Sequence, residues 1–535
     1  MKRLGRISAA LLVAALALTG CQAGSGNTDQ AAWPDQGTPG GGGTLTVVSN
    51  AELSSLEPGE AGTAGHAFPV LRNVLQGLLT RNTQTNEIEP LLATEWSSPD
   101  NLHWVFKLRK DVVWHDDTPL NAANAAKSLT YIWDKKVPYA GNFVGAPVKF
   151  SAIDEYTLGM ELTAPDSLIP AKMTVMPLAS PVQIETAPQT LPEKMIGTGP
   201  YKFVSFTPGS GVKLELNTKY FNLHPGMFDK VDWTFRTESQ VRAQLVQTGE
   251  ADVAVGVTPE QCEGAATSGA HCLSVQATGF RFLRPDQYNQ TVLADERIRQ
   301  AIAMGVDRPG IVSAFINKDG KVLDNAGPEG MVGFDKDVKS FNYDVDAAKK
   351  LVADAKADGI NTGLPLTIKY RVGFFPNIDD MAQTVATNLN AIGLNAKVEA
   401  MTDAEGLAQY RQNFEGNTIE KIPADRGWIF LATTTNDLFD FSQPADTLLT
   451  CKGKFSVTCD QEFEAAYKKA NQLVGDERQK AFADLWSSLY EKDVPFLPIG
   501  QTANNFVISD RAKIQPTSDT FLPLTEARGP KTAGN

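Results

Sequence analysis

Residues 366–400, LTIKYRVGFFPNIDDMAQTVATNLNAIGLNAKVEA, decide the fold class of this chain. In their middle part the apolar positions recur at the three- and four-residue spacing of one helix face: Ile378, Met381, Ala382, Val385, Leu389 and Ile392. Gly393 follows this stripe as a C-cap. Residues 366–370 in front form an apolar strand, and residues 394–400 behind alternate apolar with polar side chains. The order strand, helix, strand predicts a βαβ unit and an α/β fold.

The segments around this unit continue the mixed pattern. Asp344 and Gly359 bracket a predicted helix over residues 346–358. Further elements are a strand over residues 43–48, a helix then a strand over 241–255, and two late helices over 463–470 and 482–489. A length of 535 residues suggests about three domains.

The composition excludes several classes of protein. With 42% hydrophobic and 21% charged residues the chain is an ordinary globular protein. The formal net charge of −13 argues against a nucleic-acid partner. Five histidines and five cysteines leave little material for a metal site. The chain has no G-x-S-x-G, P-loop or H-E-x-x-H motif, so we expect no enzyme, no cofactor and no resident metal.

The N-terminal residues predict export and anchoring. Lys2, Arg3 and Arg6 precede an apolar run over residues 7–18, which is too short to span a bilayer and suits a signal peptide over residues 1–20. The run ends in Leu-Thr-Gly-Cys, which resembles a bacterial lipobox with Cys21 as the lipidated residue. Residues 21–43 are small, polar and Gly-rich, as in a flexible tether. The alternative is an ordinary signal peptide followed by an unrelated cysteine.

The other four cysteines form two close pairs in sequence. In an exported chain, Cys262 with Cys272 and Cys451 with Cys459 predict two local disulfides. Two other pairings are open to four cysteines. A zinc site made of all four thiolates is a further alternative, disfavoured because no C-x2-C pair is present.

Six further motifs occur in one order along the chain. They are Leu56-Glu57-Pro58, residues 74–81 (VLQGLLTR), 88–96 (IEPLLATEW), 104–122 (WVFKLRKDVVWHDDTPLNA), 196–203 (IGTGPYKF) and 249–253 (GEADV). Together they resemble the solute-binding proteins of bacterial ABC importers, in the peptide- and nickel-binding family. Asp117 departs from the pattern, since it stands where the family usually has glycine.

The resemblance implies a clamshell of three domains and a function in capture. Lobe I would comprise residues 44–75, 196–285 and 506–525, inserted domain II residues 76–195, and lobe III residues 286–505. Two hinged lobes populate open and closed states, and a ligand shifts this equilibrium. The implied protein is an extracytoplasmic, lipid-anchored monomer that delivers a peptide or peptide-like solute to an ABC permease. Alternatives are a non-peptide solute (an oligosaccharide, an opine-like compound or a metal chelate) and a solute-sensing receptor.

By resemblance, two segments line the ligand cleft. One is the loop over residues 62–66, with Thr63, Ala64 and His66; the other is the strand with Arg426, Gly427, Trp428 and Ile429. Their backbone groups would pair with an extended peptide as an added strand, and Trp428 would form an apolar wall. The alternative for Trp428 is a core aromatic residue.

The family's peptide binders hold the free amino group of the ligand with an aspartate three residues after this tryptophan, because a partly buried ammonium needs a carboxylate partner. Here that position is Leu431. Asp437 is the candidate substitute and Asp440 lies nearby, although surface roles for both are equally open. His115 lies inside a structural motif and is expected to be structural.

Overall fold

The computed structural model describes residues 41–529, except for residues 51–55, 58–67, 83–84, 135–147, 267–268, 288–291, 317–319, 412–426 and 519–520. The expected signal peptide, Cys21 and most of the tether lie outside the described residues, as do Thr63, Ala64, His66 and Arg426.

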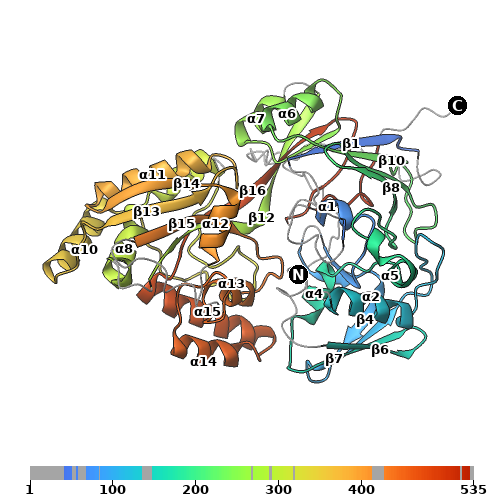
Figure 1. The fold of residues 1–535 in the computed structure, drawn as a ribbon, viewed down its shortest axis with the longest axis horizontal. Coiled ribbons are helices and arrows are strands. Elements are labelled where there is room, and N and C mark those ends of the chain that lie inside the picture. The colour runs from blue at the N-terminus through green and yellow to red at the C-terminus, as the bar shows by residue number, and fades with distance from the viewer. Residues whose placement is uncertain are drawn as a thin grey trace, which may run out of the picture.

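One ten-stranded sheet runs through both lobes, in the order β14-β13-β15-β12-β16-β11-β1-β10-β9-β8. Its strands are β1 (Thr44–Ser49), β8 (Tyr201–Thr207), β9 (Gly211–Leu216), β10 (Lys230–Phe235), β11 (Val253–Val255), β12 (Ala270–Pro285), β13 (Pro365–Arg371), β14 (Asn395–Met401), β15 (Gly427–Thr434) and β16 (Leu497–Ser509). In Figure 1, β13, β14 and β15 lie in the left-hand lobe, β1, β8 and β10 lie in the right-hand one, and β12 and β16 run between them.

The predicted βαβ unit is confirmed. β13 and β14 pair in parallel, and α11 (Ile378–Ala391) connects them. The apolar stripe of α11 is buried in the core of lobe III, because side chains at this spacing share one helix face. Strand β15 adds to the other side of β13, also in parallel.

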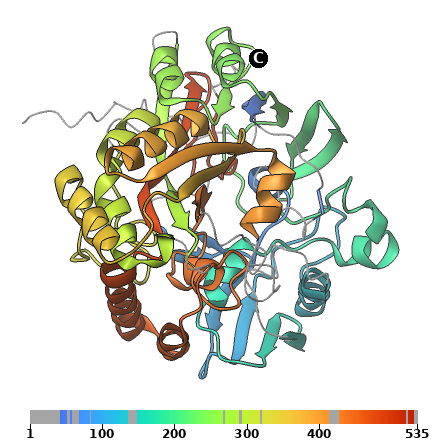
Figure 2. The same cartoon turned by 60° about the vertical axis from the view of Figure 1, so that its left-hand side comes forward.

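The helices complete the two lobes. Lobe III contains α8 (Glu296–Gly305), α9 (Arg308–Phe315), α10 (Val345–Ala357), α12 (Asp403–Tyr410), α13 (Ser442–Leu448), α14 (Gln461–Ala470) and α15 (Gly475–Asp493), and lobe I contains α1 (Phe68–Leu71), α6 (Ser239–Gln247) and α7 (Pro259–Ala265). Asp344 caps α10 by accepting from the Ala347 amide, as its place before the helix predicts. Figure 2 brings lobe III forward, and both views place α14 and α15 below its strands.

A separate four-stranded sheet has the order β4-β5-β7-β6. It comprises β4 (Ala93–Ser97), β5 (His103–Leu108), β6 (Val148–Asp154) and β7 (Thr157–Leu162), next to the hairpin of β2 (Leu79–Arg81) and β3 (Ile88–Pro90), and to helices α2 (Ala122–Asp134), α4 (Ile169–Val175) and α5 (Pro181–Thr186). Buried apolar residues form separate clusters over residues 78–178, over lobe I and over 280–499. The division into three domains stays a proposal, and we use its names below.

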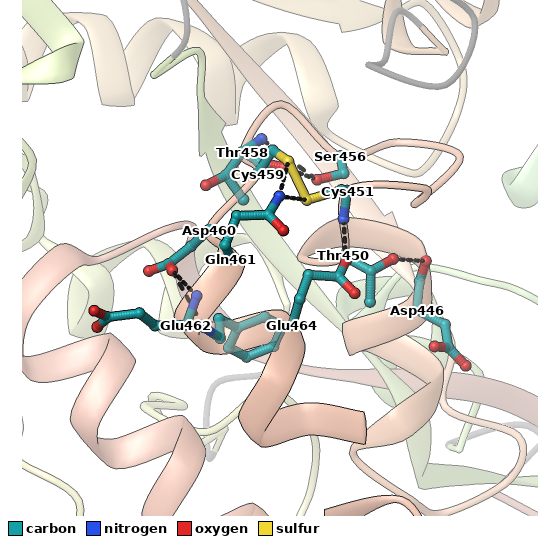
Figure 3. Close-up of a disulfide and its surroundings, with 11 residues drawn as sticks. Asp446, Thr450, Cys451, Ser456, Thr458, Cys459, Asp460, Gln461, Glu462 and Glu464 are labelled. Atoms are coloured by element: carbon teal, nitrogen blue, oxygen red, sulfur yellow. Dashed lines mark hydrogen bonds between the residues drawn. A yellow bond between two sulfur atoms is a disulfide. The ribbon is translucent and has the colours of Figure 1, made fainter. Parts of the chain in front are cut away.

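Both local cysteine pairs lie at disulfide distance. The sulfurs of Cys262 and Cys272 are 2.00 Å apart, and those of Cys451 and Cys459 are 2.10 Å apart. Figure 3 shows the second pair at the start of α14, where Gln461 Nε2 lies 3.4 Å from each sulfur. The pair therefore closes the loop between α13 and α14 in lobe III.

Candidate functional site

The two strands that cross between the lobes are irregular at their midpoint. Gln276 pairs with Ala503 and Phe280 pairs with Gln501, so residues 277–279 of β12 stand opposite Thr502 alone. Such a bulge interrupts the ladder and bends the strand. Side chains compensate for the interruption, because Gln501 Nε2 donates to the Ala277 carbonyl at 2.8 Å and Thr502 Oγ1 donates to the Gly279 carbonyl at 2.9 Å.

The bulge also contacts both lobes. Thr278 is buried; its amide donates to Ser518 of lobe I at 3.1 Å, and its hydroxyl donates to Asp437 of lobe III at 3.3 Å. Gly279 is required here, because an added Cβ would lie 2.5 Å from the Thr434 carbonyl at the end of β15. The midpoint of β12 therefore lies directly against the carboxyl end of β15.

Trp428 lies at the other, amino-terminal, end of β15. It pairs with Thr367 near the start of β13, and 8% of its surface is exposed. The Lys369 ammonium lies 3.6 Å from the centroid of the indole, and Phe430 packs edge-on at 6.5 Å. Ile429 belongs to the same buried core. This geometry corresponds to the alternative of a core aromatic residue, and contact between Trp428 and a ligand stays a prediction.

Leu431 is also in the core of lobe III. It is 2% exposed and pairs with Leu283 of β12. A leucine suits this position because its side chain packs in the apolar core of lobe III. Asp437 instead lies beyond the end of β15, where it accepts from Thr278 and, at 2.9 Å, from the Thr435 hydroxyl. The structure thus associates Asp437 with the bulge, and its contact with a ligand remains a prediction.

The carboxyl end of β15 carries partly or fully exposed hydroxyl side chains that the sequence interpretation did not select. Thr433 and Thr434 are half-buried and Thr435 is exposed. In open parallel α/β sheets, ligands bind outside the carboxyl ends of the strands, and β13, β14 and β15 are parallel. In the sequence, this end of the strand is indicated by three threonines directly after the apolar run of residues 428–432. The site best supported by geometry is this end of β15 beside the bulge.

His115 connects two of the sequence motifs. Its ring Nε2 lies 3.0 Å from the Gly199 carbonyl, and the Gly197 amide donates to Nδ1 at 3.3 Å. Burial lowers the pKa of His115 to about 4, so the ring is neutral at pH 7, with the proton on Nε2. His115 is therefore a structural residue that holds lobe I against domain II.

No group of three histidine, cysteine, aspartate or glutamate side chains among the described residues could hold a metal ion. In the same part of the chain, no helix has both the length and the apolar character needed to cross a membrane.

A polar cavity of about 450 Å³ lies between lobe I and domain II. Arg72 and Thr517 line it from lobe I, and Arg81, Glu89 and Arg109 line it from domain II. The guanidinium of Arg72 stacks on Phe521 at 4.1 Å, and Asn82 donates to Glu89 at 2.8 Å. The charged side chains in the walls of this cavity therefore already contact other protein side chains, and they make the walls polar.

Known proteins resemble this chain over most of its length. The model of bacterial extracellular solute-binding proteins, family 5 middle region, matches residues 87–454. Di/tripeptide-binding protein 2 of Pseudomonas aeruginosa (strain UCBPP-PA14) is 23% identical over 495 residues, which cover 85% of this chain and 89% of that protein.

Solved structures show the same fold. The ABC transporter substrate-binding protein CtaP of Listeria monocytogenes aligns with a TM-score of 0.78 and 22% identity, covering 92% of this chain and 100% of CtaP. AgaA from A. tumefaciens R10, in complex with agropinic acid, aligns with a TM-score of 0.74 and 20% identity, covering 91% of this chain and 99% of AgaA.

Proposed function

Because the chain belongs to the bacterial extracellular solute-binding proteins of family 5, we propose that it captures a peptide or peptide-like solute between its two lobes and delivers it to an ABC permease. The family consists of extracytoplasmic substrate-binding proteins and not of enzymes, and we propose no covalent step. The observation that carries the mechanism is the bulge of β12 opposite Thr502, at the crossing between the lobes and beside the carboxyl end of β15.

Two features of the chain support this mechanism. First, side chains donate hydrogen bonds to the Ala277 and Gly279 carbonyls of the bulge, and such side-chain bonds can adjust when the strand bends, as a hinge requires. Second, the end of β15 offers threonine hydroxyls and main-chain groups, which recognise an extended backbone more than its side chains. A Kd in the micromolar range corresponds to about 8 kcal/mol, and a ligand that makes most of these contacts only in the closed form can shift a hinge equilibrium of a few kcal/mol.

The peptide class is favoured by the relatives. The Pseudomonas protein is named as a di/tripeptide-binding protein and is similar over 85% of this chain. Leu431 in the core leaves no carboxylate three residues after Trp428, so we propose that the ligand amine is either blocked or held elsewhere. AgaA carries agropinic acid on the same fold, which keeps a non-peptide, opine-like solute as the alternative.

The anchor is a separate part of the proposal. Lipidation of Cys21 would hold the protein at the outer face of a membrane through a Gly-rich tether of residues 22–43, with a reach of roughly 25 Å. We expect wild-type protein, expressed in a bacterial host with an azide-tagged fatty acid, to carry the label and to stay with the membranes. A Cys21→Ser variant should lose the label, and a variant that keeps it would contradict the anchor.

Calorimetry on protein expressed from Gln22 onward tests the ligand class. We propose titration with trialanine, N-acetyl-trialanine and agropinic acid. Binding of either peptide supports the proposal, and preference for the acetylated one indicates a site without a free-amine carboxylate. Binding of agropinic acid alone favours the opine-like alternative.

A bulky substitution tests the position of the site. Thr434→Trp should abolish binding of the peptide that the wild type takes, because the indole would fill the space beside the bulge. Thr186→Trp is the matched control on the surface of domain II, and it should bind normally. Three flat titrations with folded wild-type protein would reject the peptide proposal, and full binding by Thr434→Trp would reject the location.

A further inference from the structure

A short segment of lobe III reaches into domain II. This latch segment, residues 436–441, follows the end of β15. Leu438 is 5% exposed and belongs to the apolar core of residues 78–178, not to that of its own lobe. Arg81 at the end of β2 donates from Nη2 to the Leu438 carbonyl at 2.9 Å, and its guanidinium lies 4.9 Å from the centroid of the Phe439 ring. The two bodies are therefore joined by an apolar contact and a hydrogen bond.

Lobe III holds the latch segment in shape by its own contacts. Arg478 of α15 makes two hydrogen bonds of 2.8 Å to the carboxylate of Asp440, and both side chains are buried. Asn436 accepts from the Asp440 amide at 3.1 Å. Phe439 has a φ of 54°, a left-handed conformation that side chains of this size rarely adopt. Such backbone conformations persist where the surroundings fix them, so the segment is preformed.

The latch segment adjoins the bulge between the lobes. Asp437, next to Leu438, accepts from Thr278 in the bulge of β12. A rotation of lobe III about this bulge must withdraw Leu438 from the core of domain II. The same rotation must break the hydrogen bond between Arg81 and Leu438. Opening of the lobes and release of the latch are therefore one event.

We propose that Arg81 and Leu438 form a closure latch, which sets the ratio of closed to open protein and thereby the ligand affinity, without touching the ligand. The proposal rests on the proposed function, in which ligand is held between closing lobes. Arg81 and Leu438 are positioning residues, because they act on the lobes and not on the ligand. For a ligand that binds only the closed form, the apparent affinity is the intrinsic affinity multiplied by the closed fraction of the protein. Loss of a hydrogen bond between an arginine and a carbonyl should lower the closed-to-open ratio roughly tenfold.

Single-molecule FRET without ligand tests the latch independently of the proposed function. Dyes placed through Val182→Cys in α5 and Lys350→Cys in α10 report the distance between domain II and lobe III, and both positions are exposed. We expect Arg81→Ala to lower the closed-to-open ratio about tenfold through the lost hydrogen bond, and Leu438→Ala to lower it about tenfold or more through the lost apolar burial. Arg81→Lys keeps a donor and should restore part of the closed population.

Lys127→Ala is the matched control. It removes an exposed cation that pairs with Glu185 inside domain II, and it should leave the ratio unchanged. Circular dichroism tests whether each variant is folded. Arg81 also donates to the Asn86 carbonyl, so Arg81→Ala can disturb the β2–β3 hairpin. Leu438→Ala keeps Arg81 and therefore avoids this effect. Ratios within twofold of wild type in both alanine variants, or a wild type that never reaches the short distance, would overturn the latch. Those results would leave the calorimetric test of ligand capture untouched.

Discussion

His115 offers a quantitative test of how lobe I and domain II are joined. Its neutral ring bridges the Gly197 amide and the Gly199 carbonyl, and burial lowers its pKa to about 4. A histidine in the unfolded chain has a pKa of about 6.5. The unfolded chain therefore binds this proton more readily than the folded protein between pH 6.5 and pH 4, so acidification through this window destabilises the fold.

The size of the effect follows from these two pKa values. Between pH 7 and pH 5, linkage predicts a loss of about 2 kcal/mol in the free energy of unfolding from His115 alone. His115→Gln cannot take up this proton. At pH 7 the variant should be less stable than wild type by about 1 kcal/mol, because the amide cannot replace both hydrogen bonds.

Urea denaturation of wild type and His115→Gln at pH 7 and pH 5 measures the difference directly. Other groups that titrate in this window cancel, because both proteins contain them. We expect the difference between the proteins to close or reverse at pH 5. His103→Gln is the control, because the pKa of His103 is raised by its hydrogen bond to Asp100, which gives the opposite sign, and its ring is exposed. A wild type that loses no more stability than His115→Gln between pH 7 and pH 5 would refute a buried neutral ring.

Three further predictions concern groups in lobe III. Trp428→Ala separates the two expectations for this side chain: a core indole predicts a loss of about 3–5 kcal/mol in urea denaturation with ligand affinity within threefold of wild type, whereas a cleft wall predicts a large loss of affinity in the folded variant. Arg478→Ala should cost about 3–5 kcal/mol because it leaves Asp440 buried without its cation, and an unchanged urea midpoint would contradict the pair. Replacing Cys451 and Cys459 together by serine should cost about 2–3 kcal/mol through the loop that the disulfide closes, with an unchanged midpoint as the contrary result.

Local elements of the fold could be predicted from the sequence because their signals are local. The stripe of α11, the capping Asp344 and the alternation in β14 each depend on residues a few positions apart. The ten-stranded sheet could not be derived in this way, because β12 pairs with β16 across more than 200 residues and the register depends on tertiary packing. The bulge opposite Thr502 is likewise set by pairing and not by composition.

The place of the candidate site along β15 was harder to predict than the strand itself. The resemblance places Gly427 and Trp428 on a strand that lines the cleft, yet nothing in these residues tells which end of the strand meets the other lobe. Gly279 in the bulge of β12 lies against the Thr434 carbonyl, so the carboxyl end of β15 is the end at the crossing between the lobes, and Trp428 lies at the opposite end. Leu438 reads in the sequence as an ordinary apolar residue of lobe III. Only the folded chain shows that it packs with domain II.

Native mass spectrometry of the protein expressed from Gln22 onward tests the central claim most directly. We expect wild-type protein to carry one small solute that is released on denaturation and that fragments as a peptide or a peptide-like compound does. Thr434→Trp should be recovered folded and without this mass. A bound solute retained in full by Thr434→Trp would contradict the proposed site between the lobes. Wild-type protein that carries nothing and takes up neither trialanine nor N-acetyl-trialanine would contradict peptide capture itself.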